Sequence, residues 1–542
     1  MLLTCGASIV FGSVLLAFLP TLHNGFVLWD DDLNLLDNPA YRGLSLAHLR
    51  WMFTTTLAGP YQPLSWLTLG LDYVVWGMNP KGYHLTSLVL HAAGTVALYV
   101  LLVAMLERER ERGSDLGVAA AAVVGALFWG IHPLRVESVA WATERRDVLS
   151  GPFFVLTVLA YVRMAEAQRL GRPWRRWFVA SLVCYLLSLL AKASGMMLPI
   201  VLLVLDTYPL RRFGRESRGR AALEKLPYAA LAGAAALIAF RGQAALSGMR
   251  PVAGYGVLDR IAQAAYGLCF YPWKSVAPVG LSALYLLPRR LDLAAPRYIV
   301  SMLAVVGVTL ALIRLRHRWP WALAACACYV VLIAPVLGFV QTGPQLVADR
   351  FSYLPSLPAS ALVAAGVHRL LAAGARRRVA LPAAVAALGV LGVLTARQTA
   401  TWRDSFTLWG QMLAVDPTNH VALAKRGWLR QQRGDLDGAQ ADYSEGIRHH
   451  PDAILYFNRA TLEYLRRQLD AAIADYSECL RINPGDPRTL NNRGMARQEK
   501  GDWEGAAADF AEALRLAPPG FAGRALIEKN LATARGRLPG DG

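Results

Sequence analysis

The sequence has few cysteines, and none of them is arranged as a metal or disulfide motif. Its 542 residues include six cysteines, and no two of these form a Cys-x-x-Cys pair. Most lie in or beside apolar runs, where a thiol behaves as a small apolar side chain. The pattern therefore excludes a disulfide framework and indicates no zinc site.

Charge is also scarce, and it is unevenly placed. Charged residues make up 17% of the chain and hydrophobic residues 55%, whereas about a quarter of an average soluble domain is charged. Residues 1–397 contain long stretches without charge, and residues 398–542 are rich in it. This predicts an integral membrane domain over 1–397 and a polar domain over 398–542.

The first apolar run, 2–22, lacks the marks of a cleavable leader. No Lys or Arg precedes it, and no small-x-small cleavage motif follows it. We therefore expect a retained membrane span.

Nucleic acid is not an expected partner, despite the net charge of +18. Most basic residues of the apolar part lie in short loops between apolar runs, which is typical of loops on the cytoplasmic side of a membrane. Membrane lipid is the expected surrounding. Five such Arg-rich loops lie at 107–116, 163–176, 211–225, 314–318 and 369–378.

About eleven apolar runs have the length and composition of membrane spans. They lie near 3–22, 83–106, 117–133, 148–165, 176–191, 194–210, 226–241, 297–313, 319–339, 354–372 and 379–396. With the Arg-rich loops inside, the N-terminus is cytoplasmic and the C-terminal domain is outside. The segment 259–287 stays open: its prolines favour a re-entrant or surface segment, and a span there would reverse the sidedness of everything that follows.

The first predicted outer loop, 23–81, is too long for a simple connection. Ser45 is a candidate N-cap for a short helix that carries Leu46, Leu49 and Phe53 on one face. A second apolar stretch, 64–76, is too short to cross a membrane, and we expect another interfacial helix.

A repeat of 33 or 34 residues organises the C-terminal part. Pro417, Pro451, Pro484 and Pro518 recur at intervals of 34, 33 and 34 residues. An Ala-x-x-x-aromatic pair repeats in phase with them, at Ala439/Tyr443, Ala472/Tyr476 and Ala506/Phe510. This is typical of tetratricopeptide repeats, which hold peptides or proteins in a concave groove. The predicted units are 420–451, 454–484 and 487–518, with a partial leading repeat at 401–417 and a capping helix at 521–537.

Three consecutive aspartates, Asp30, Asp31 and Asp32, follow the first apolar run. A transferase that moves a sugar onto a hydroxyl needs a carboxylate to accept the hydroxyl proton. Adjacent carboxylates raise one another's pKa or share a cation. The alternative is a solvated loop or a helix N-terminus, where aspartates are merely stabilising.

A second polar cluster follows the third apolar run. It contains His132, Glu137, Glu144, Arg146 and Asp147. A lipid-linked phosphate needs cations, and the planar guanidinium group suits it. Ordinary salt bridging within a loop remains the alternative.

Further candidates lie near the predicted outer ends of other runs. Lys192 is a candidate phosphate ligand or a side chain that snorkels to the surface. Arg350 is a candidate phosphate ligand that Asp349 would orient, or half of an ion pair at a helix start. His84 is a site candidate near the surface, while His91, two helical turns away, is more consistent with a buried structural role.

The order of these motifs resembles a known family. Phe26 to Asp32 with Asn38-Pro39, Gln62 to Ser65, Gly82 to Leu85 with His91, His132-Pro133 with Glu137 and Arg146, Ala191-Lys192, and Ala348 to Pro355 occur in sequence before the repeats. Together they resemble bacterial relatives of the transmembrane-and-tetratricopeptide protein O-mannosyltransferases, of the GT-C glycosyltransferase class.

The resemblance implies an all-α GT-C-like bundle of about eleven spans, in a bacterial inner membrane, with an extracytoplasmic repeat domain. It implies an inverting transfer of a sugar from a polyprenyl-phosphate donor to a Ser or Thr of a protein. The expected site residues are Asp30, Asp31 and Asp32 as the catalytic carboxylates; Arg146, Lys192 and Arg350 for the donor phosphate; and His84, His132, Glu137, Asp349 and Tyr353 as supporting groups.

The sequence departs from the family where Phe351 replaces a usual tyrosine and where Ala193-Ser194 follow Lys192 in place of an acidic residue. No metal site is expected from spacing, although a divalent cation at the aspartates stays open. Two other functions also stay open: a membrane-anchored repeat scaffold, and a lipid-linked glycan ligase or a transporter.

Overall fold

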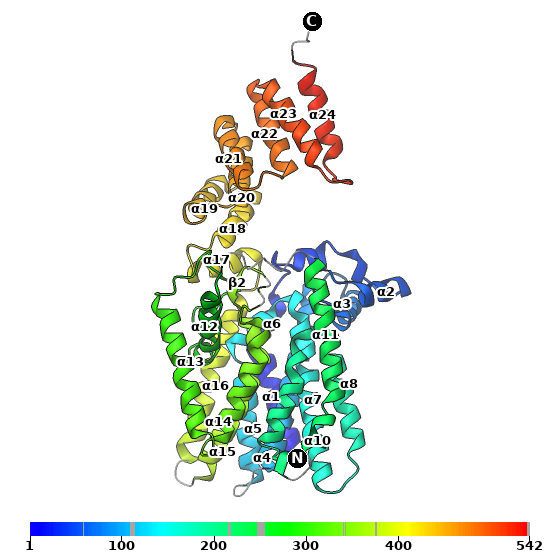
Figure 1. The fold of residues 1–542 in the computed structure, drawn as a ribbon, viewed down its shortest axis with the longest axis vertical. Helices are drawn as coiled ribbons and strands as arrows, with labels where there is room; N and C mark the ends of the chain where they lie inside the picture. The colour runs from blue at the N-terminus through cyan, green and yellow to red at the C-terminus, as the bar shows by residue number, and fades with distance from the viewer. Residues whose placement is uncertain are drawn as a thin grey trace. The chain divides into compact units, whose positions relative to one another are not determined.

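The computed structural model describes residues 1–57, 59–108, 114–214, 218–245, 255–339, 341, 343–373 and 377–538. It consists of two compact units, Met1–Ser405 and Phe406–Gly542, and helices dominate both (Figure 1). The only strands among the described residues are β1 (Tyr285–Leu286) and β2 (Gln345–Val347), which pair antiparallel. The predicted all-α class is confirmed, while the assignment of functions to residues 1–397 and 398–542 stays a prediction.

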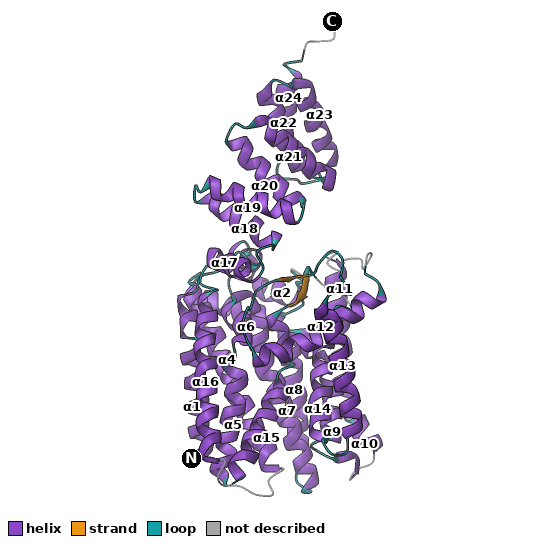
Figure 2. Cartoon of the chain, turned by 90° about the vertical axis from the view of Figure 1, so that its left-hand side faces the viewer, coloured by secondary structure: helices purple, strands orange, loops and turns teal. Residues whose placement is uncertain are grey.

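Long apolar helices build the first unit, and Figure 2 shows them running side by side. Within the described residues, five helical segments are long and apolar enough to cross a membrane: Pro80–Arg108, Ala142–Arg169, Ala221–Gly242, Pro296–Leu315 and Arg378–Ala400. A sixth arises if the bent pair Asp115–Gly130 and Pro133–Ala140, which meet at 53°, is one span.

Shorter apolar helices account for several of the other predicted runs. They are Leu2–Ala17, Ala193–Thr207, Pro320–Val336 and Leu357–Ala372. Length and composition alone do not reach eleven spans over the described ranges, so that number stays a prediction. Besides the three helices described below, the described helices of this unit are α1 (Leu2–Ala17), α4 (Pro80–Arg108), α5 (Asp115–Gly130), α6 (Val136–Ala140), α7 (Arg145–Arg169), α8 (Arg175–Ala191), α9 (Leu198–Thr207), α10 (Arg218–Leu223), α11 (Leu226–Ala245), α13 (Pro296–Leu315), α14 (Pro320–Ile333), α15 (Leu357–Ala372) and α16 (Arg377–Ala400).

The two short helices expected between 23 and 81 are present as α2 (Leu46–Thr54) and α3 (Pro63–Trp76). Ser45 is the N-cap residue of α2, but its hydroxyl contacts His48 Nδ1 at 2.8 Å and makes no capping hydrogen bond. Ser45 is therefore the N-cap residue that the sequence predicts, but its hydroxyl does not cap the helix.

The segment 259–287 forms a helix, α12 (Val257–Val276), followed by β1. Asp259 and Lys274 lie near its two ends, and α12 is not among the described helices that are apolar enough to cross a membrane. Its buried face includes Phe270 and Tyr271, which pack under β2.

Close helix contacts in the first unit depend on small residues. A Cβ on Gly125 of α5 would lie 2.6 Å from the Cβ of Ala364 on α15, and one on Gly94 of α4 would lie 2.8 Å from Pro152 of α7. Since real side chains never approach so closely, these helices can pack only with glycine at both positions.

Helix pairs build the second unit: α17 (Ser405–Val415), α18 (His420–Gln432), α19 (Leu436–His449), α20 (Ala453–Leu465), α21 (Leu469–Ile482), α22 (Pro487–Lys500), α23 (Trp503–Leu516) and α24 (Arg524–Arg535). The small and aromatic residues of the repeat pattern meet where paired helices cross. A Cβ on Gly427 would lie 2.6 Å from the Tyr443 ring, and one on Gly494 would lie 2.7 Å from the Phe510 ring.

Each complete repeat also contains the same partly buried ion pair. An arginine of the first helix donates two hydrogen bonds to an aspartate sixteen positions later on the second helix, a planar arrangement that fixes both side chains. The pairs are Arg426–Asp442 at 2.9 and 2.7 Å, Arg459–Asp475 at 2.6 and 2.9 Å, and Arg493–Asp509 at 3.0 and 2.7 Å.

Candidate functional site

The three adjacent aspartates have different environments, and Asp31 is fully buried. Its Oδ2 accepts a hydrogen bond from the Val27 amide at 2.9 Å, and its Oδ1 accepts from the Thr143 amide at 3.0 Å and from the Thr143 hydroxyl at 2.6 Å. Burial raises the pKa of Asp31 to about 7, against the opposing effect of these hydrogen bonds. Both oxygens are occupied, so Asp31 fastens the first loop to the segment that precedes α7.

Asp30 remains exposed, and its backbone φ of 67° lies in the left-handed region. An aspartate tolerates this conformation better than most residues, but it still costs about 1 kcal/mol. The reversal turns Asp30 away from its buried neighbour. Desolvation by the surrounding protein raises the pKa of Asp30, while the positive charges of Arg146 and Arg350 lower it. Asp30 therefore lies within electrostatic reach of both guanidinium groups.

Asp32, the third of the series, is half-buried and begins a π-helical turn, Asp32–Leu36. Its backbone carbonyl accepts a hydrogen bond from Asp37 at 2.8 Å. The three aspartates therefore differ in burial: Asp31 is buried, Asp32 is half-buried and Asp30 is exposed.

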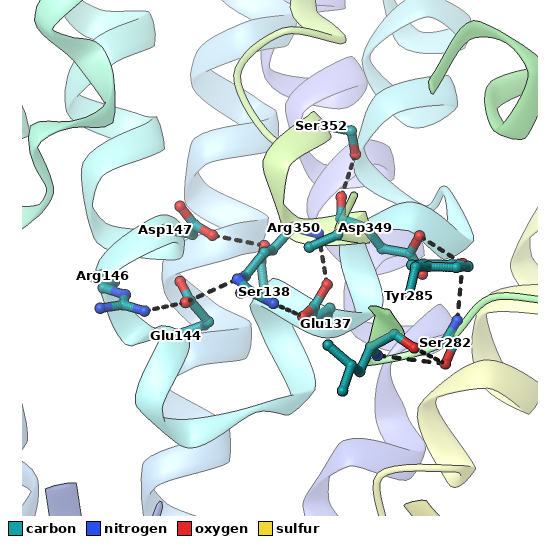
Figure 3. A network of polar contacts seen from close by, with 12 residues as sticks. Glu137, Ser138, Glu144, Arg146, Asp147, Ser282, Tyr285, Asp349, Arg350 and Ser352 are labelled. Carbon is teal, nitrogen blue, oxygen red and sulfur yellow. Dashed lines mark hydrogen bonds and ion pairs between the residues drawn. The ribbon is translucent and has the colours of Figure 1, made fainter. Parts of the chain in front are cut away.

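The three predicted phosphate-binding cations surround one buried carboxylate, Glu144, whose side chain has no exposed surface. Arg146 forms an ion pair with it, Lys192 Nζ lies 2.9 Å from its Oε2, and Arg350 Nε lies 3.6 Å from its Oε1. Figure 3 shows Glu144 with Arg146 and Arg350. The exposed fraction of the side chain is 16% for Arg146, 21% for Lys192 and 13% for Arg350. Each can thus neutralise Glu144 and still offer donors at the surface.

Asp147 supports this network from the start of α7. Its Oδ1 lies 2.7 Å from Lys192 Nζ, and its Oδ2 accepts a hydrogen bond from the Ser138 hydroxyl at 3.0 Å. Lys192 therefore bridges two carboxylates, and it lies directly after α8, where Ala191 ends the helix. The snorkelling alternative for Lys192 does not describe these contacts.

Glu137 holds Arg350 in place. Its Oε2 accepts the Arg350 backbone amide at 2.7 Å, and its Oε1 forms an ion pair with the guanidinium group. The guanidinium carbon also lies 5.6 Å from the centre of the Trp141 ring and 5.0 Å from that of Phe351. Burial alone would lower the pKa of Arg350, but Glu137 and Glu144 raise it above its usual range. Arg350 is a fixed and permanently charged group.

The Asp349 side chain contacts Tyr285, while Glu137 contacts Arg350, so the orienting role expected of Asp349 stays a prediction. The Asp349 side chain is buried and accepts a hydrogen bond from the Tyr285 hydroxyl at 3.1 Å. Burial raises the pKa of Asp349 well above its usual range, and the nearby negative charge of Glu137 raises it further. The pairing of β1 with β2 brings Tyr285 to this position. The group that contacts Arg350 is Glu137, which the sequence pattern placed among the supporting residues.

Tyr353 is buried beneath the network and is fixed by His91. The His91 Nε2 lies 2.8 Å from the carbonyl oxygen of Gly130, which can only accept, so Nδ1 accepts from the Tyr353 hydroxyl at 2.8 Å. Trp129 Nε1 also donates to the Tyr353 carbonyl at 3.0 Å. Tyr353 thereby anchors the turn that carries Arg350, and His91 has the structural role expected of it.

His84 and His132 are both buried and both bind backbone groups. His84 Nε2 contacts the Gly25 carbonyl at 3.3 Å. His132 lies at the bend between α5 and α6, where its Nδ1 accepts the Leu134 amide at 3.2 Å and its Nε2 donates to the Ser275 carbonyl at 3.1 Å. The structure does not bring either ring into the network around Glu144.

Three residues of the site were not selected from the sequence. Glu144 was recognised only as one member of a polar cluster, and nothing in its spacing marks it as the centre. Thr143, the partner of Asp31, gave no signal, and Trp141, which lies against Arg350, was given no role. Trp141 also stacks on Trp402 of the same unit at 5.8 Å between ring centres.

Carboxylates and cations are balanced in this network, since Glu137, Glu144 and Asp147 face Arg146, Lys192 and Arg350. Over the described parts of the chain, the one group of three residues whose ligand atoms lie close enough for a metal ion is His420, His450 and Asp452, in the second unit. No such ligand set includes the triple aspartate.

Comparison with known proteins gives partial matches. The chain is 30% identical over 152 residues to the human protein O-mannosyl-transferase TMTC2, which covers 28% of this chain and 17% of that protein. It is 32% identical over 186 residues to Drosophila melanogaster Tmtc1 and 30% identical over 220 residues to human TMTC1, both also named protein O-mannosyl-transferases. These matches cover 33% and 38% of this chain.

The chain is similar to the TMTC proteins. The resemblance stated from the motif order is thereby confirmed, although the matches span only about a fifth of each relative's length, 20% for the Drosophila protein and 24% for human TMTC1. A tetratricopeptide repeat family model matches residues 487–519. Among solved structures, the first tetratricopeptide domain of human RPAP3 matches 22% of this chain and 99% of that chain at 24% identity, with a TM-score of 0.20 that is too low to bear on the fold.

Proposed function

We propose that this chain is an integral-membrane glycosyltransferase of the GT-C class. It transfers a mannose-like sugar from a polyprenyl-phosphate donor to a Ser or Thr hydroxyl of an extracytoplasmic protein. The observation that carries the proposal is the exposed carboxylate of Asp30 within electrostatic reach of Arg146 and Arg350. The printed names of the similar proteins, protein O-mannosyl-transferases, support the same activity.

In this proposal the three cations bind the donor phosphate. Arg146, Lys192 and Arg350 each keep part of their surface exposed while Glu144 holds them together from below. Charge-assisted hydrogen bonds to phosphate are among the strongest that proteins make. Negative charge builds up on the phosphate as the bond to the sugar breaks, so cations fixed in advance stabilise the transition state more than the bound donor.

Asp30 is the proposed general base. It accepts the proton of the acceptor hydroxyl while that oxygen attacks the anomeric carbon from the face opposite the phosphate, which inverts the configuration. The bond between the anomeric carbon and the phosphate oxygen breaks, and the polyprenyl phosphate leaves with both electrons of that bond. A raised pKa favours this role, because a carboxylate whose pKa lies nearer the working pH accepts a proton more readily. Asp31 has no free oxygen for this step.

The repeat unit is proposed to bind the acceptor protein, as tetratricopeptide stacks bind peptides in their concave groove. The positive-inside pattern supports an orientation with the Arg-rich loops in the cytoplasm of a bacterial cell and the repeats outside the inner membrane. Residues 1–397 then form the catalytic domain and residues 398–542 the acceptor-binding domain.

The test is transfer by the purified full-length chain in lipid nanodiscs. Radiolabelled polyprenyl-phosphate mannose and glucose are supplied separately with a periplasmic protein extract, with and without a chelator. We expect label in a protein band that releases it on alkaline β-elimination, as an O-linked sugar does. Label found only in glycan would instead identify a glycan ligase. If a correctly folded chain transferred no label from either donor, the result would favour the membrane-anchored repeat scaffold.

A further inference from the structure

A large apolar cavity lies in the first unit, away from the cluster around Glu144. Its volume is about 910 Å³, and side chains of α4, α7, α9, α14 and α15 line it. The lining is aliphatic over most of its length, with polar groups at one end. In a membrane such a cavity fills with hydrocarbon, because empty apolar space forfeits dispersion contacts.

The polar end has a definite composition. Tyr208 and Trp321 line it, and an arginine stacks on each ring: Arg211 lies 5.7 Å from the Tyr208 ring centre, and Arg369 lies 6.0 Å from the Trp321 ring. His368 lines the same end, and its buried Nδ1 has no hydrogen-bond partner among the residues that the structure describes. Arg369 and His368 therefore line the polar end of a hydrocarbon-like cavity, and Arg211 lies one ring away, beside the lining residue Tyr208.

The cavity is long enough to hold acyl chains of one leaflet. Along α15 its lining runs from Leu357 to Ala373, which spans about 24 Å at the helical rise of 1.5 Å per residue. The hydrocarbon core of a bilayer is about 30 Å thick, so one leaflet accounts for about half of that. Arg369 lies at the end of α15 that is remote from Arg350, which precedes the helix.

We infer that this cavity is a binding site for a two-chain anionic glycerophospholipid, with its acyl chains among the apolar residues and its phosphate at Arg211 and Arg369. Aromatic rings and arginines are the groups that hold lipid headgroups at the membrane surface. His368 Nδ1 is available to the phosphate or to the glycerol hydroxyls. A neutral lipid would leave the two arginines unused.

The sugar donor is not the occupant that the charges favour. A donor held by its phosphate at Arg350 would direct only the apolar end of its chain toward Arg211 and Arg369. That end carries no negative charge for the two arginines to bind. The lipid site is independent of the proposed transfer and would exist equally in a scaffold or a ligase.

The test is native mass spectrometry of the full-length chain released from vesicles of equal parts phosphatidylglycerol and phosphatidylcholine. We expect retained phosphatidylglycerol on the unaltered chain, and at least a fivefold loss in the double variant Arg211→Ala/Arg369→Ala. Both side chains are exposed, so their truncation leaves no cavity in the core. Arg172→Ala, an exposed arginine just beyond the end of α7, is the matched control and retains lipid as before.

A second variant addresses the cavity itself. Ala365→Trp fills the space beside α15, and we expect it to exclude the lipid while the thermal unfolding midpoint shows an intact fold. Equal retention of both lipids, unchanged retention in the arginine double variant, or displacement of phosphatidylglycerol by added polyprenyl phosphate would each overturn the assignment. The last result would identify the cavity as part of the donor site.

Discussion

A single oxygen of Asp31 accepts two hydrogen bonds from Thr143, one from its amide at 3.0 Å and one from its hydroxyl at 2.6 Å. The two residues are 112 positions apart, and this contact joins the first loop to the segment that leads into α7. It also separates two roles within the triple aspartate, since the occupied carboxylate positions the loop that presents the exposed Asp30.

Replacing Asp31 with asparagine tests the structural role. An amide can still accept from Thr143, but its NH₂ group then faces the Val27 amide, and a buried unpaired donor costs about 1–3 kcal/mol. We expect Asp31→Asn to lower the thermal unfolding midpoint in detergent. Asp37→Asn, in the same loop and exposed, is the control and should unfold as the parent does. An Asp31→Asn chain as stable as its parent would remove the structural assignment.

Replacing Asp30 tests the base. Loss of a general base typically lowers the rate by about 10²–10⁴-fold, and an exposed side chain contributes little to folding. We therefore expect Asp30→Asn to unfold at the parent temperature while transfer from the labelled donor falls by at least 100-fold. Asp37→Asn again serves as control. Transfer at the parent rate would exclude Asp30 as the base.

Lys192 bridges Glu144 and Asp147, so its removal should leave buried charge uncompensated. Breaking a buried ion pair by removing one partner costs about 3 kcal/mol, and we expect Lys192→Met to be destabilised by roughly this amount. The double variant Lys192→Met/Asp147→Asn should recover part of the loss, because one unpaired carboxylate is gone. Thermal unfolding of both variants measures the difference, and a double variant less stable than the single one contradicts the bridging role.

Arg350→Lys tests whether geometry or charge matters at the proposed phosphate site. Lysine keeps the charge but loses the planar group that pairs with Glu137 and stacks between Trp141 and Phe351. We expect the KM for the donor to rise about tenfold or more with little change in the unfolding midpoint. Lys81 is exposed and lies outside the network, so Lys81→Arg is the control for an exchange between lysine and arginine. An unchanged KM would show that any cation suffices there.

The repeat unit has its own pH dependence. Burial raises the pKa of Glu463 to about 7, above the value near 4.5 expected in the unfolded chain. The folded state then binds the proton more tightly, so stability is highest below about pH 4.5 and falls as the pH rises toward 7. We expect Glu463→Gln to stabilise the chain by about 1 kcal/mol at pH 8, a value reduced for screening by water, and to change little at pH 4.5.

Calorimetry of the full-length chain at both pH values measures this difference. Glu504→Gln, on an exposed face of α23, is the matched control and should leave the pH dependence unaltered. A gain that is equal at pH 4.5 and pH 8 would show that the effect is not titration of Glu463.

The sequence predicted the features that depend on residues close together in the chain. The tetratricopeptide period was visible because each unit repeats its own proline, small residue and aromatic residue, and the contact of Gly427 with Tyr443 is made within one unit. The helical class followed in the same way from long apolar runs. The number of spans did not, because short apolar helices such as Leu2–Ala17 can cross, tilt or lie within a bundle.

The site depended on contacts that no local pattern encodes. Glu137 and Arg350 are 213 positions apart, and the sequence could nominate both without showing that they pair. Asp349 was expected to orient Arg350 simply because it is the neighbour of that residue. Asp30 and Asp31 differ in burial and in backbone angle, and three identical residues in the sequence show neither difference.

The long separation between Glu137 and Arg350 has a consequence for biosynthesis. A ribosome makes Glu137 well before Arg350 emerges, since chains are completed from the N-terminus. Glu144 and Asp147 can pair earlier with Arg146 and Lys192, but Glu137 must stay hydrated until the segment that carries Arg350 arrives. A nascent chain arrested before residue 350 should therefore remain open at this point to water-soluble labelling reagents, and the completed protein should be closed to them.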